Sequence, residues 1–546
     1  MPAPVSEHEI ESLTRRIGEE LFERMRGGGP WIVQPAWWQG RLLRLFMHEE
    51  QLKGRALRLI AELPRLGHDP RAIAQRLRAH FSANGAVQAD GGSNAEVAAP
   101  MTPAPRDAGE PATPNGALGE LSGGGRGGLT RLIERLVQFE RDDSLRARLL
   151  ARLAWAAAHS MARRFIAGET VAEAEQALLR LRRRRLAFTL DVLGETTSSQ
   201  READAAHQTY LHLIRELPKK AAAWPPVPQI DYQSRAGHGP VESIPRVNIS
   251  VKLTSLHAGL DGGDPAEHAR IVKERLRPLL RAAMAGGVHL HIDMEHYAIK
   301  DLTLAVCRDL FAEPEFRDYA HFGLVLQAYL RDADRDAAEI VEYARRRGTP
   351  LGIRLVKGAY WDTEVALAGQ RGTPCPVWQQ KWETDACYER LSRLLLHNHR
   401  YTRVAFASHN VRSLAHAIAL RRLWDVPGPA FELQMLYGMG DEIQSAAVAL
   451  GERCRVYTPY GKLLAGMAYL TRRLLENTAN ESFLRHAAEQ DVPIERLLAN
   501  PREVGARAGW HGLVEPGRAP TGPATASLRQ TVPRGESHQA STGVHA

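Results

Sequence analysis

The sequence LGIRLVK at residues 351–357 is a short apolar run that ends in a lysine, and it decides the fold because runs of the same kind recur along the chain. They alternate with stretches of helical spacing between about residues 186 and 478. The eight runs are LAFTLDVL (186–193), NISVKLT (248–254), VHLHIDM (288–294), GLVLQAY (323–329), LGIRLVK (351–357), RVAFASH (403–409), FELQMLY (431–437) and CRVYT (454–458). Strands that alternate with helices form a parallel sheet, and this number of strands closes a (β/α)₈ barrel.

An open, doubly wound sheet is the alternative fold for this pattern. Such a sheet binds its cofactor through a G-x-G-x-x-G turn between a strand and a helix. No such turn follows any of the runs, and the densest glycine segment, GGGRGG at residues 123–128, lies outside them. We therefore expect an α/β fold with a distorted, TIM-like (β/α)₈ barrel.

The remainder of the chain divides by composition. Apolar residues at three- and four-residue spacings predict an all-helical arm over residues 1–83 and a helical domain over residues 129–185. Residues 84–128 are rich in Ala, Gly and Pro and read as a flexible linker, because they bury too little apolar surface to offset the entropy of ordering. We expect the barrel at 186–485, a C-terminal helical segment at 486–510 and a disordered tail at 511–546.

Charge and cysteine content limit the class of protein. The 546 residues include 71 Lys and Arg against 63 Asp and Glu, and part of this excess lies in RLRRRR at 180–185, a pattern typical of a solvated helix face. No zinc-finger, helix-turn-helix or RNA-binding signature is present, so we expect no nucleic-acid partner. Four cysteines without C-x-x-C spacing argue against a disulfide framework and a zinc site. The polar start and the lack of about 18 consecutive apolar residues predict neither secretion nor a membrane span.

Polar residues gather at the ends of the predicted strands, where a barrel of this kind places its site. They are Lys252, Asp293, Glu295, Gln327, Arg354, Lys357, Ser408, His409, Asn410 and Tyr457. One ionisable group at a strand end is typical of a structural ion pair, whereas several that converge on one mouth indicate a pocket. The cations suit a carboxylate or phosphate ligand, and they are Lys252, Arg354 and Lys357 with Arg472 and Arg473 from a following helix. A solvated doublet on an outer helix face is the other interpretation of the two adjacent arginines, since consecutive helix residues point about 100° apart.

The third run carries a different pattern. His289, His291, Asp293 and Glu295 alternate along it, so they project from one face of a strand. H-x-H followed by a carboxylate is similar to the divalent-metal site of a barrel hydrolase, which here would use His291, Asp293 and His409. Nearby cations would repel a dication, and a layer of histidines in the barrel core is the alternative.

Several segments occur together in one order: DMEHY (293–297), IRLVKGAYWD (353–362), ASHN (407–410), FELQMLYGMGD (431–441) and YLTRRLLENTANESF (469–483). They resemble the proline dehydrogenase half of the bifunctional proline utilization A enzymes, over about residues 130–485. The segment TRRIGEELFERMRGGGP at 14–30 is also similar to that family. The resemblance includes neither the aldehyde dehydrogenase half nor the ribbon-helix-helix domain of some relatives.

This resemblance implies a flavoprotein that oxidises L-proline to Δ1-pyrroline-5-carboxylate with FAD and passes the electrons to a membrane quinone. The reaction would be the first step of proline catabolism to glutamate. Hydride leaves C5 of the ring for N5 of the flavin, so the ring must lie in near-attack contact with the cofactor. A cationic pocket should lower the ammonium pKa of bound proline, and its nitrogen must be unprotonated for hydride to leave.

Matching the motifs residue by residue assigns expected roles. Lys252, Arg472 and Arg473 would hold the substrate carboxylate, and Asp293 and Arg354 match catalytic residues of the family. The ring pocket would be walled by Leu355, Tyr360, Tyr457 and Tyr469. The positions that match FAD contacts are Met294, Gln327, Val356, Lys357, Gly358, Ala359, Trp361, Ser408 and His409. Glu195 matches a carboxylate that pairs with the arginines in the absence of substrate, and Lys357 and Arg354 would neutralise pyrophosphate and reduced flavin.

The expected partners and location follow from the same resemblance. They are L-proline, a membrane quinone, a separately encoded aldehyde dehydrogenase and a second copy of the chain. We expect a cytoplasmic protein, with peripheral association at the inner face of the cytoplasmic membrane as an option. Two other functions stay open at this point: the metal-dependent hydrolase and a catalytically silent barrel that serves as an interaction module.

Overall fold

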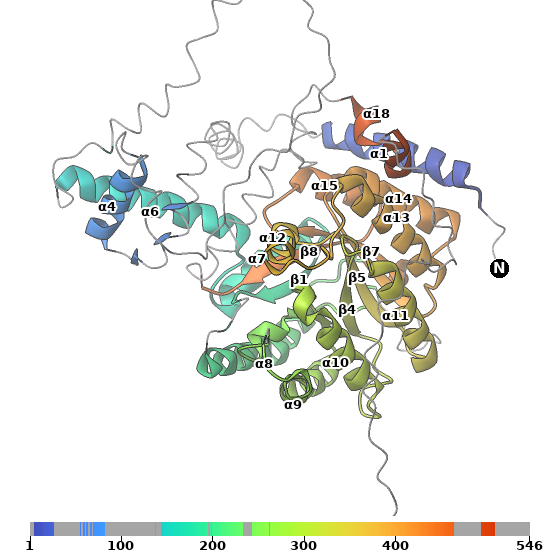
Figure 1. The fold of residues 1–546 in the computed structure, drawn as a ribbon, viewed down its shortest axis with the longest axis horizontal. Helices are drawn as coiled ribbons and strands as arrows, with labels where there is room; N and C mark the ends of the chain where they lie inside the picture. Colours follow the sequence, from blue (N-terminus) through green and yellow to red (C-terminus); the bar gives the residue numbers. More distant parts are fainter. Residues whose placement is uncertain are drawn as a thin grey trace, which may run out of the picture.

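Eight parallel strands form a closed barrel in which each strand pairs with its neighbours in the chain, from β1 to β8 (Figure 1). The computed structural model describes residues 5–26, 69–81, 144–194, 199–232, 243–260, 262–462 and 493–507, with isolated residues at 55–67, 137 and 197. The strands are β1 Ala187–Val192, β2 Asn248–Val251, β3 His289–Ile292, β4 Phe322–Gln327, β5 Leu351–Val356, β6 Thr402–Ala407, β7 Phe431–Leu436 and β8 Cys454–Tyr460. Pairing of β1 with β8 closes the barrel, with Ala187 opposite Arg455 and Val192 opposite Tyr460. The predicted barrel is confirmed.

Helices cover the outside of this barrel. They are α7 Val171–Arg183, α8 Gln200–Ala222, α9 Pro265–Gly286, α10 Lys300–Ala312, α11 Ala333–Arg347, α12 Trp361–Arg371, α13 Lys381–His397, α14 Val411–Leu423 and α15 Asp441–Ala449, with 3₁₀ turns at Leu253–Ser255, Tyr297–Ile299 and Gly428–Ala430. Local sequence sets their ends, as in α9, where Asp264 accepts a hydrogen bond from the N–H of Ala266 and Pro265 occupies the first turn. The same helix ends at Gly287, whose φ of 60° lies in the left-handed region that glycine adopts without strain.

A long N-terminal helix, α1 (Glu7–Arg26), packs on α14 and α15. The buried guanidinium of Arg412 on α14 binds Glu11 of α1 through both Nη atoms, each at 2.7 Å, and also binds Glu389 of α13. The Nη1 atom of Arg412 further donates to the carbonyl of Leu498, which follows α18 (Ile494–Leu497). One arginine therefore joins α1, the barrel helices and the segment that contains α18 and α19 (Pro501–Arg507).

Two further helices, α4 (Pro70–Phe81) and α6 (Leu145–Phe165), pack on each other to one side of the barrel (Figure 1). Their buried face includes Ile73, Leu77 and Phe81 and forms a small core separate from that of the barrel. The predicted linker at 84–128 and tail at 511–546 lie outside the described residues, and the domain boundaries stay predictions. Within the described ranges, no helix has the length and apolar character that a membrane crossing requires.

The interior of the barrel is polar along much of its length. Arg354 of β5 reaches across to Ser250 of β2 at 2.9 Å and to Gln434 of β7 at 2.8 Å, and contacts between such distant strands are possible only through the interior. Closer to the end of the barrel where the strands begin, His289 and His291 are buried, and their stacked rings have centres 4.5 Å apart. Aliphatic layers are usual in barrels of this type. The hydrogen bonds within this one instead fix polar side chains in place.

Candidate active site

Four charged or hydroxyl side chains meet inside the barrel. Lys252 and Asp293 directly follow β2 and β3, and Arg354 and Tyr457 lie within β5 and β8. The carboxylate of Asp293 forms an ion pair with Arg354 and accepts a hydrogen bond from the hydroxyl of Tyr457 at 2.6 Å. The Nζ atom of Lys252 lies 3.4 Å from the same carboxylate and donates to the Tyr457 oxygen at 3.1 Å. Lys252, Asp293 and Arg354 are each at most 7% exposed. The structure thus brings together residues that the sequence placed on four different strands.

The cations of this cluster already have carboxylate partners. Lys252 forms an ion pair with Asp191 at the end of β1 in addition to its contact with Asp293. Lys357, at the end of β5, forms an ion pair with Asp385 of α13. Lys252 and Lys357 are therefore both paired with protein carboxylates in this structure, and their predicted role in holding an anionic ligand stays a prediction. A ligand carboxylate there must exchange with a protein carboxylate.

The ionisation of Asp293 follows from its surroundings. Burial raises the pKa of its carboxyl, but the charges of Arg354 and Lys252 and the hydrogen bond from Tyr457 outweigh burial, so the pKa lies below its ordinary value. Burial and the nearby carboxylates hold the pKa of Tyr457 well above its ordinary value, so this hydroxyl stays protonated. The cluster therefore contains an ionised carboxylate that accepts hydrogen bonds and a neutral phenol that donates one.

Two residues that sequence reasoning missed hold Arg354 in place. Its Nε atom donates to Oε1 of Gln434, and its Nη2 atom donates to the hydroxyl of Ser250. With Nη1 on Asp293, each nitrogen of the guanidinium has a partner, which fixes its plane. Gln434 alternates with Glu432 along β7, and that spacing was the available signal that both face the interior.

The ends of β3 and β4 carry two of the positions matched to FAD. Met294 is buried just after β3, and its carbonyl lies 3.5 Å from Nε2 of Gln327. The same Nε2 atom donates to the carbonyl of Glu295 at 3.1 Å. The Oε1 atom of Gln327 is buried and has no hydrogen-bond partner in the described structure. An unsatisfied buried acceptor at a strand end indicates a site for an external donor.

The segment after β5 forms one wall of the mouth. Val356 is its last strand residue, and the Nζ atom of Lys357 lies 5.8 Å from the centre of the Tyr388 ring. Gly358 has a φ of 138°, and any side chain there would collide with the ring of Tyr329. Ala359 and the Tyr360 N-cap then lead into α12, which begins at Trp361.

The aromatic residues of this segment are held in place on the rim. The Tyr360 ring lies 4.1 Å from the ring of His296. Trp361 is 40% exposed and donates through its indole N–H to the carbonyl of Trp378 at 2.8 Å. This indole is fixed at one end while its ring faces solvent, an arrangement that suits contact with a flat ligand.

The end of β6 supplies a third wall. The Ser408 hydroxyl accepts a hydrogen bond from the N–H of Asn410 at 3.0 Å, and Asn410 caps α14. The Nε2 atom of His409 accepts from the N–H of Leu436 at 3.2 Å, which places the ring proton on Nδ1. Both side chains are therefore ordered by backbone contacts before any ligand binds.

Other predicted site residues cannot be placed. Arg472, Arg473, Tyr469 and Glu195 lie outside the described residues, so the proposed arginine contribution to the mouth stays a prediction. Leu355 is described and is fully buried in β5.

The alternative of a metal site is not supported by the geometry. No group of three His, Cys, Asp or Glu side chains within the described ranges is arranged to hold a metal ion. Asp293 is engaged by Arg354, Lys252 and Tyr457, and His409 uses Nε2 to accept from the backbone. His291 lies in the buried histidine layer, as the alternative interpretation predicted.

Comparison with known proteins now identifies the family. Residues 174–486 match the proline dehydrogenase family, and residues 11–113 match the proline utilization A N-terminal domain. The chain is 31% identical over 370 residues to the bifunctional protein PutA of Klebsiella aerogenes, covering 65% of this chain and 27% of that protein. It is 33% identical over 326 residues to proline dehydrogenase 1 of Bacillus subtilis strain 168, covering 59% of this chain and 89% of that protein.

Solved structures agree with these sequence matches. The proline utilization A of Bdellovibrio bacteriovorus inactivated by N-propargylglycine matches with a TM-score of 0.74 and 36% identity, over 91% of this chain and 44% of that one. A mutant proline utilization A of Bradyrhizobium japonicum matches with a TM-score of 0.62 and 26% identity, over 93% of this chain and 47% of that one. This chain thus spans about a quarter to a half of the bifunctional proteins it matches. The chain belongs to the proline dehydrogenase family.

Proposed function

We propose that this protein binds FAD at the carboxyl mouth of the barrel and oxidises L-proline there to Δ1-pyrroline-5-carboxylate. The observation that carries the proposal is the buried cluster of Lys252, Asp293, Arg354 and Tyr457, found in a member of the proline dehydrogenase family. A relative that this chain covers over 89% of its length is named proline dehydrogenase 1. The substrate is a zwitterion with a carboxylate and an amine, and the cluster offers groups of both signs to it.

The residues at the mouth fit a flavin. The unsatisfied Oε1 atom of Gln327 would accept from a ring N–H, and the Lys357 ammonium would stand near a phosphate. The exposed ring of Trp361 and the hydroxyl of Ser408 lie on two walls of the same mouth. When bound, FAD supplies the two-electron chemistry that no side chain of this cluster provides. The residues of the chain bind, orient and shield the substrate.

Substrate binding requires an exchange of ionic partners. The carboxylate of proline would take a place on Lys252, together with Arg472 and Arg473, and Asp191 and Asp293 would then share the remaining contacts. Tyr457 would stay beside the proline ring, because its hydroxyl is hydrogen-bonded to Asp293. The centre of its aromatic ring also lies 5.8 Å from Nζ of Lys252 and 5.1 Å from Cζ of Arg354. Tyr360 would form the other side. Holding the carboxylate fixes the ring, which converts binding energy into orientation.

The local charges also favour the reactive form of the substrate. Hydride can leave C5 only from proline whose nitrogen is unprotonated. Lys252 and Arg354 lower the ammonium pKa of a bound amine by charge repulsion, and burial in the mouth acts in the same direction. The ionised Asp293 offsets part of this effect and gives the N–H group an acceptor.

The electrons would pass to a membrane quinone, so the enzyme would work in the cytoplasm at the surface of the cytoplasmic membrane. The bifunctional relatives are named for two activities, and a separate aldehyde dehydrogenase would consume the product here. Both points rest on family membership. The same holds for assembly with a second copy of the chain.

An assay with three substrates tests the proposal. The FAD-loaded protein and a soluble quinone should convert L-proline to Δ1-pyrroline-5-carboxylate, trapped as a coloured adduct. Pyrrolidine, which lacks the carboxylate, should be a far poorer substrate than L-proline, with D-proline as the stereochemical control. Arg472→Met and Arg473→Met should each raise KM by roughly one to two decades, the effect of one lost charged hydrogen bond. Equal turnover of pyrrolidine and L-proline would contradict carboxylate recognition.

A further inference from the structure

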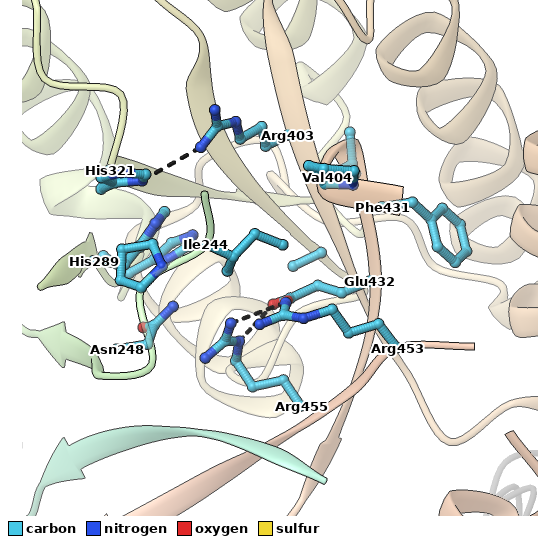
Figure 2. A pocket seen from close by; sticks show the side chains of 14 residues that line it. Ile244, Asn248, His289, His321, Arg403, Val404, Phe431, Glu432, Arg453 and Arg455 are labelled. Atoms are coloured by element: carbon cyan, nitrogen blue, oxygen red, sulfur yellow. Dashed lines mark hydrogen bonds and ion pairs between the residues drawn. The ribbon is translucent and has the colours of Figure 1, made fainter. Parts of the chain in front are cut away.

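A polar cavity lies at the end of the barrel where the strands begin, opposite the Asp293 cluster. It has a volume of about 40 Å³. The residues that matter for its chemistry lie near the beginnings of β2, β3, β7 and β8. Figure 2 shows Asn248, His289, Glu432, Arg453 and Arg455, and His291 also lines the cavity. The Asp293 cluster stands at the ends of the same strands, so this cavity is separate from the candidate active site.

The cavity contains more buried positive than negative charge. Arg453 and Arg455 both form ion pairs with Glu432, and Arg455 binds it through Nε at 2.7 Å and Nη2 at 3.0 Å. Among the described residues that line the cavity, Glu432 alone carries a carboxylate. Arg453 and Arg455 therefore share one buried carboxylate, and Arg403, which also lines the cavity, is a third guanidinium group. An excess buried charge is costly unless a counter-charge reaches it.

The surroundings of the two arginines disfavour their charged forms. Burial, together with repulsion from Arg455, lowers the pKa of Arg453 well below its ordinary value. Burial and the charge of Arg354 lower the pKa of Arg455 to about 9. A bound anion would remove this repulsion.

Unsatisfied histidine nitrogens line the same space. The Nε2 atom of His289 and both ring nitrogens of His291 are buried without a hydrogen-bond partner in the described structure. Gly352 and Gly323 make room for these rings, because a Cβ at either position would meet the imidazole at 2.7–2.9 Å. Burial and the adjacent charges lower the pKa of both rings, so each is neutral and has one N–H to donate. Buried polar atoms without partners require a ligand or water.

We propose that this cavity binds a small oxyanion, held by Arg453 and Arg455 and by the N–H groups of His289 and His291. An oxyanion supplies the missing negative charge and several acceptor atoms at once. A metal cation would stand beside two guanidinium groups, and the side chains here include no set arranged to hold one within the described part of the chain. This proposal does not rest on the proposed oxidation of proline.

Phosphate binding to the full-length protein tests the proposal. Equilibrium dialysis with labelled inorganic phosphate, at constant ionic strength set with chloride, should show saturable binding of one ion per chain in the millimolar range or tighter. Saturating L-proline should not displace the ion, since the two sites lie at opposite ends of the barrel. A parallel series with malonate separates recognition of phosphate from recognition of a carboxylate, and saturable binding of either supports the oxyanion site. Binding of neither ion, or displacement by L-proline, would overturn the proposal.

Two variants locate the site, one that removes a positive charge from the cavity and one that removes a negative charge. Arg453→Gln should weaken oxyanion binding about tenfold, because one charged hydrogen bond is lost. Glu432→Gln should strengthen it, since the competing carboxylate is removed. The control is Arg346→Gln on α11, whose side chain is 72% exposed. Folding is checked by circular dichroism, and if neither variant folds, the wild-type dialysis alone decides. A folded pair that binds phosphate like wild type would contradict the assignment.

Discussion

Arg354 and Gln434 are hydrogen-bonded inside the barrel, with the Nε atom of Arg354 2.8 Å from Oε1 of Gln434. The Nε2 atom of Gln434 donates in turn to Glu432 at 2.7 Å. One amide therefore connects the Asp293 cluster at the mouth with the Arg455 and Glu432 pair below it. The planes of the active-site groups are set by this chain of contacts through the barrel.

Replacing Gln434 should impair proline oxidation through the position of Arg354. Gln434→Met removes the acceptor for Arg354 and the donor for Glu432 at similar side-chain volume. We expect kcat/KM for L-proline to fall about tenfold and stability to fall by about 1 to 3 kcal/mol, the cost of unpaired buried polar groups. Steady-state kinetics and urea unfolding measure the two effects.

Gln444→Met is the control for that variant. Gln444 is also buried, and it donates to the carbonyls of Leu436 and Met439 without touching Arg354. It should lose stability while keeping the wild-type kcat/KM. Equal kinetic losses in the two variants would show that destabilisation alone explains the result.

Removing the Tyr457 hydroxyl should shift the pH dependence of catalysis. In Tyr457→Phe, Asp293 loses a hydrogen bond to its ionised form, so the pKa of its carboxyl rises. The acid limb of the kcat/KM profile should move to higher pH, because Asp293 must be ionised in the active cluster. Tyr460→Phe, on the same strand but outside the cluster, should keep the wild-type profile. Identical profiles for both variants would remove Asp293 from the ionisations that limit activity.

The attachment of α1 should depend on pH through Glu11. Burial raises the pKa of this carboxyl, but Arg412 and Arg15 outweigh burial and lower it to about 2. Because the carboxyl pKa is lower in the folded state, ionised Glu11 stabilises the protein at pH values above the ordinary carboxyl pKa of about 4.3. This contribution is lost as the pH falls toward 2. Wild type should exceed Glu11→Gln in unfolding free energy by about 2 kcal/mol near neutrality, after allowance for solvent screening.

Chemical unfolding from pH 6 down to about pH 2 checks this expectation, since that range spans both pKa values. The difference between wild type and Glu11→Gln should shrink with acidification. Glu20→Gln, on the exposed face of α1, is the control and should show little difference at any pH. A constant difference for Glu11→Gln would mean that its ion pair with Arg412 does not contribute to stability.

Lys357 should retain the cofactor, whereas its neighbour Lys381 should not. Both ammonium groups bind Asp385, but Lys357 stands at the end of β5 and Lys381 is 44% exposed on α13. Lys357→Met should therefore purify with substoichiometric FAD, measured by absorbance after release from the protein. Lys381→Met should keep a full complement. Full FAD content in Lys357→Met would refute a role in holding the phosphates.

Much of the barrel was predictable because its strands are buried on both faces and read as continuous apolar runs. Each of the eight runs contains or overlaps an observed strand. The polar residues that end the runs were predicted to meet, and Lys252, Asp293, Arg354 and Tyr457 do meet. Period-two spacing also placed His289 and His291 on one face.

The partners of these residues were harder to predict from sequence. Asp385 lies on α13, and nothing in its local pattern indicates that the helix brings it to Lys357. Asp191 and Gln434 sit within apolar runs. Asp191 pairs with Lys252 after the adjacent strand β2, and Gln434 pairs with Arg354 two strands away, so both pairings depend on strand register. Charge balance at the mouth is thus a tertiary property. A count of strand-end cations overstates the free positive charge.

The most direct test of the central claim is anaerobic addition of L-proline to the purified, FAD-loaded protein. We predict that the blue-light absorbance of oxidised flavin is lost on addition of one equivalent of L-proline per bound FAD. Arg354→Met should keep its yellow colour after the same addition. A wild-type protein that retains FAD but is not bleached by L-proline would contradict the proposal that the Asp293 and Arg354 cluster holds this substrate for oxidation by FAD.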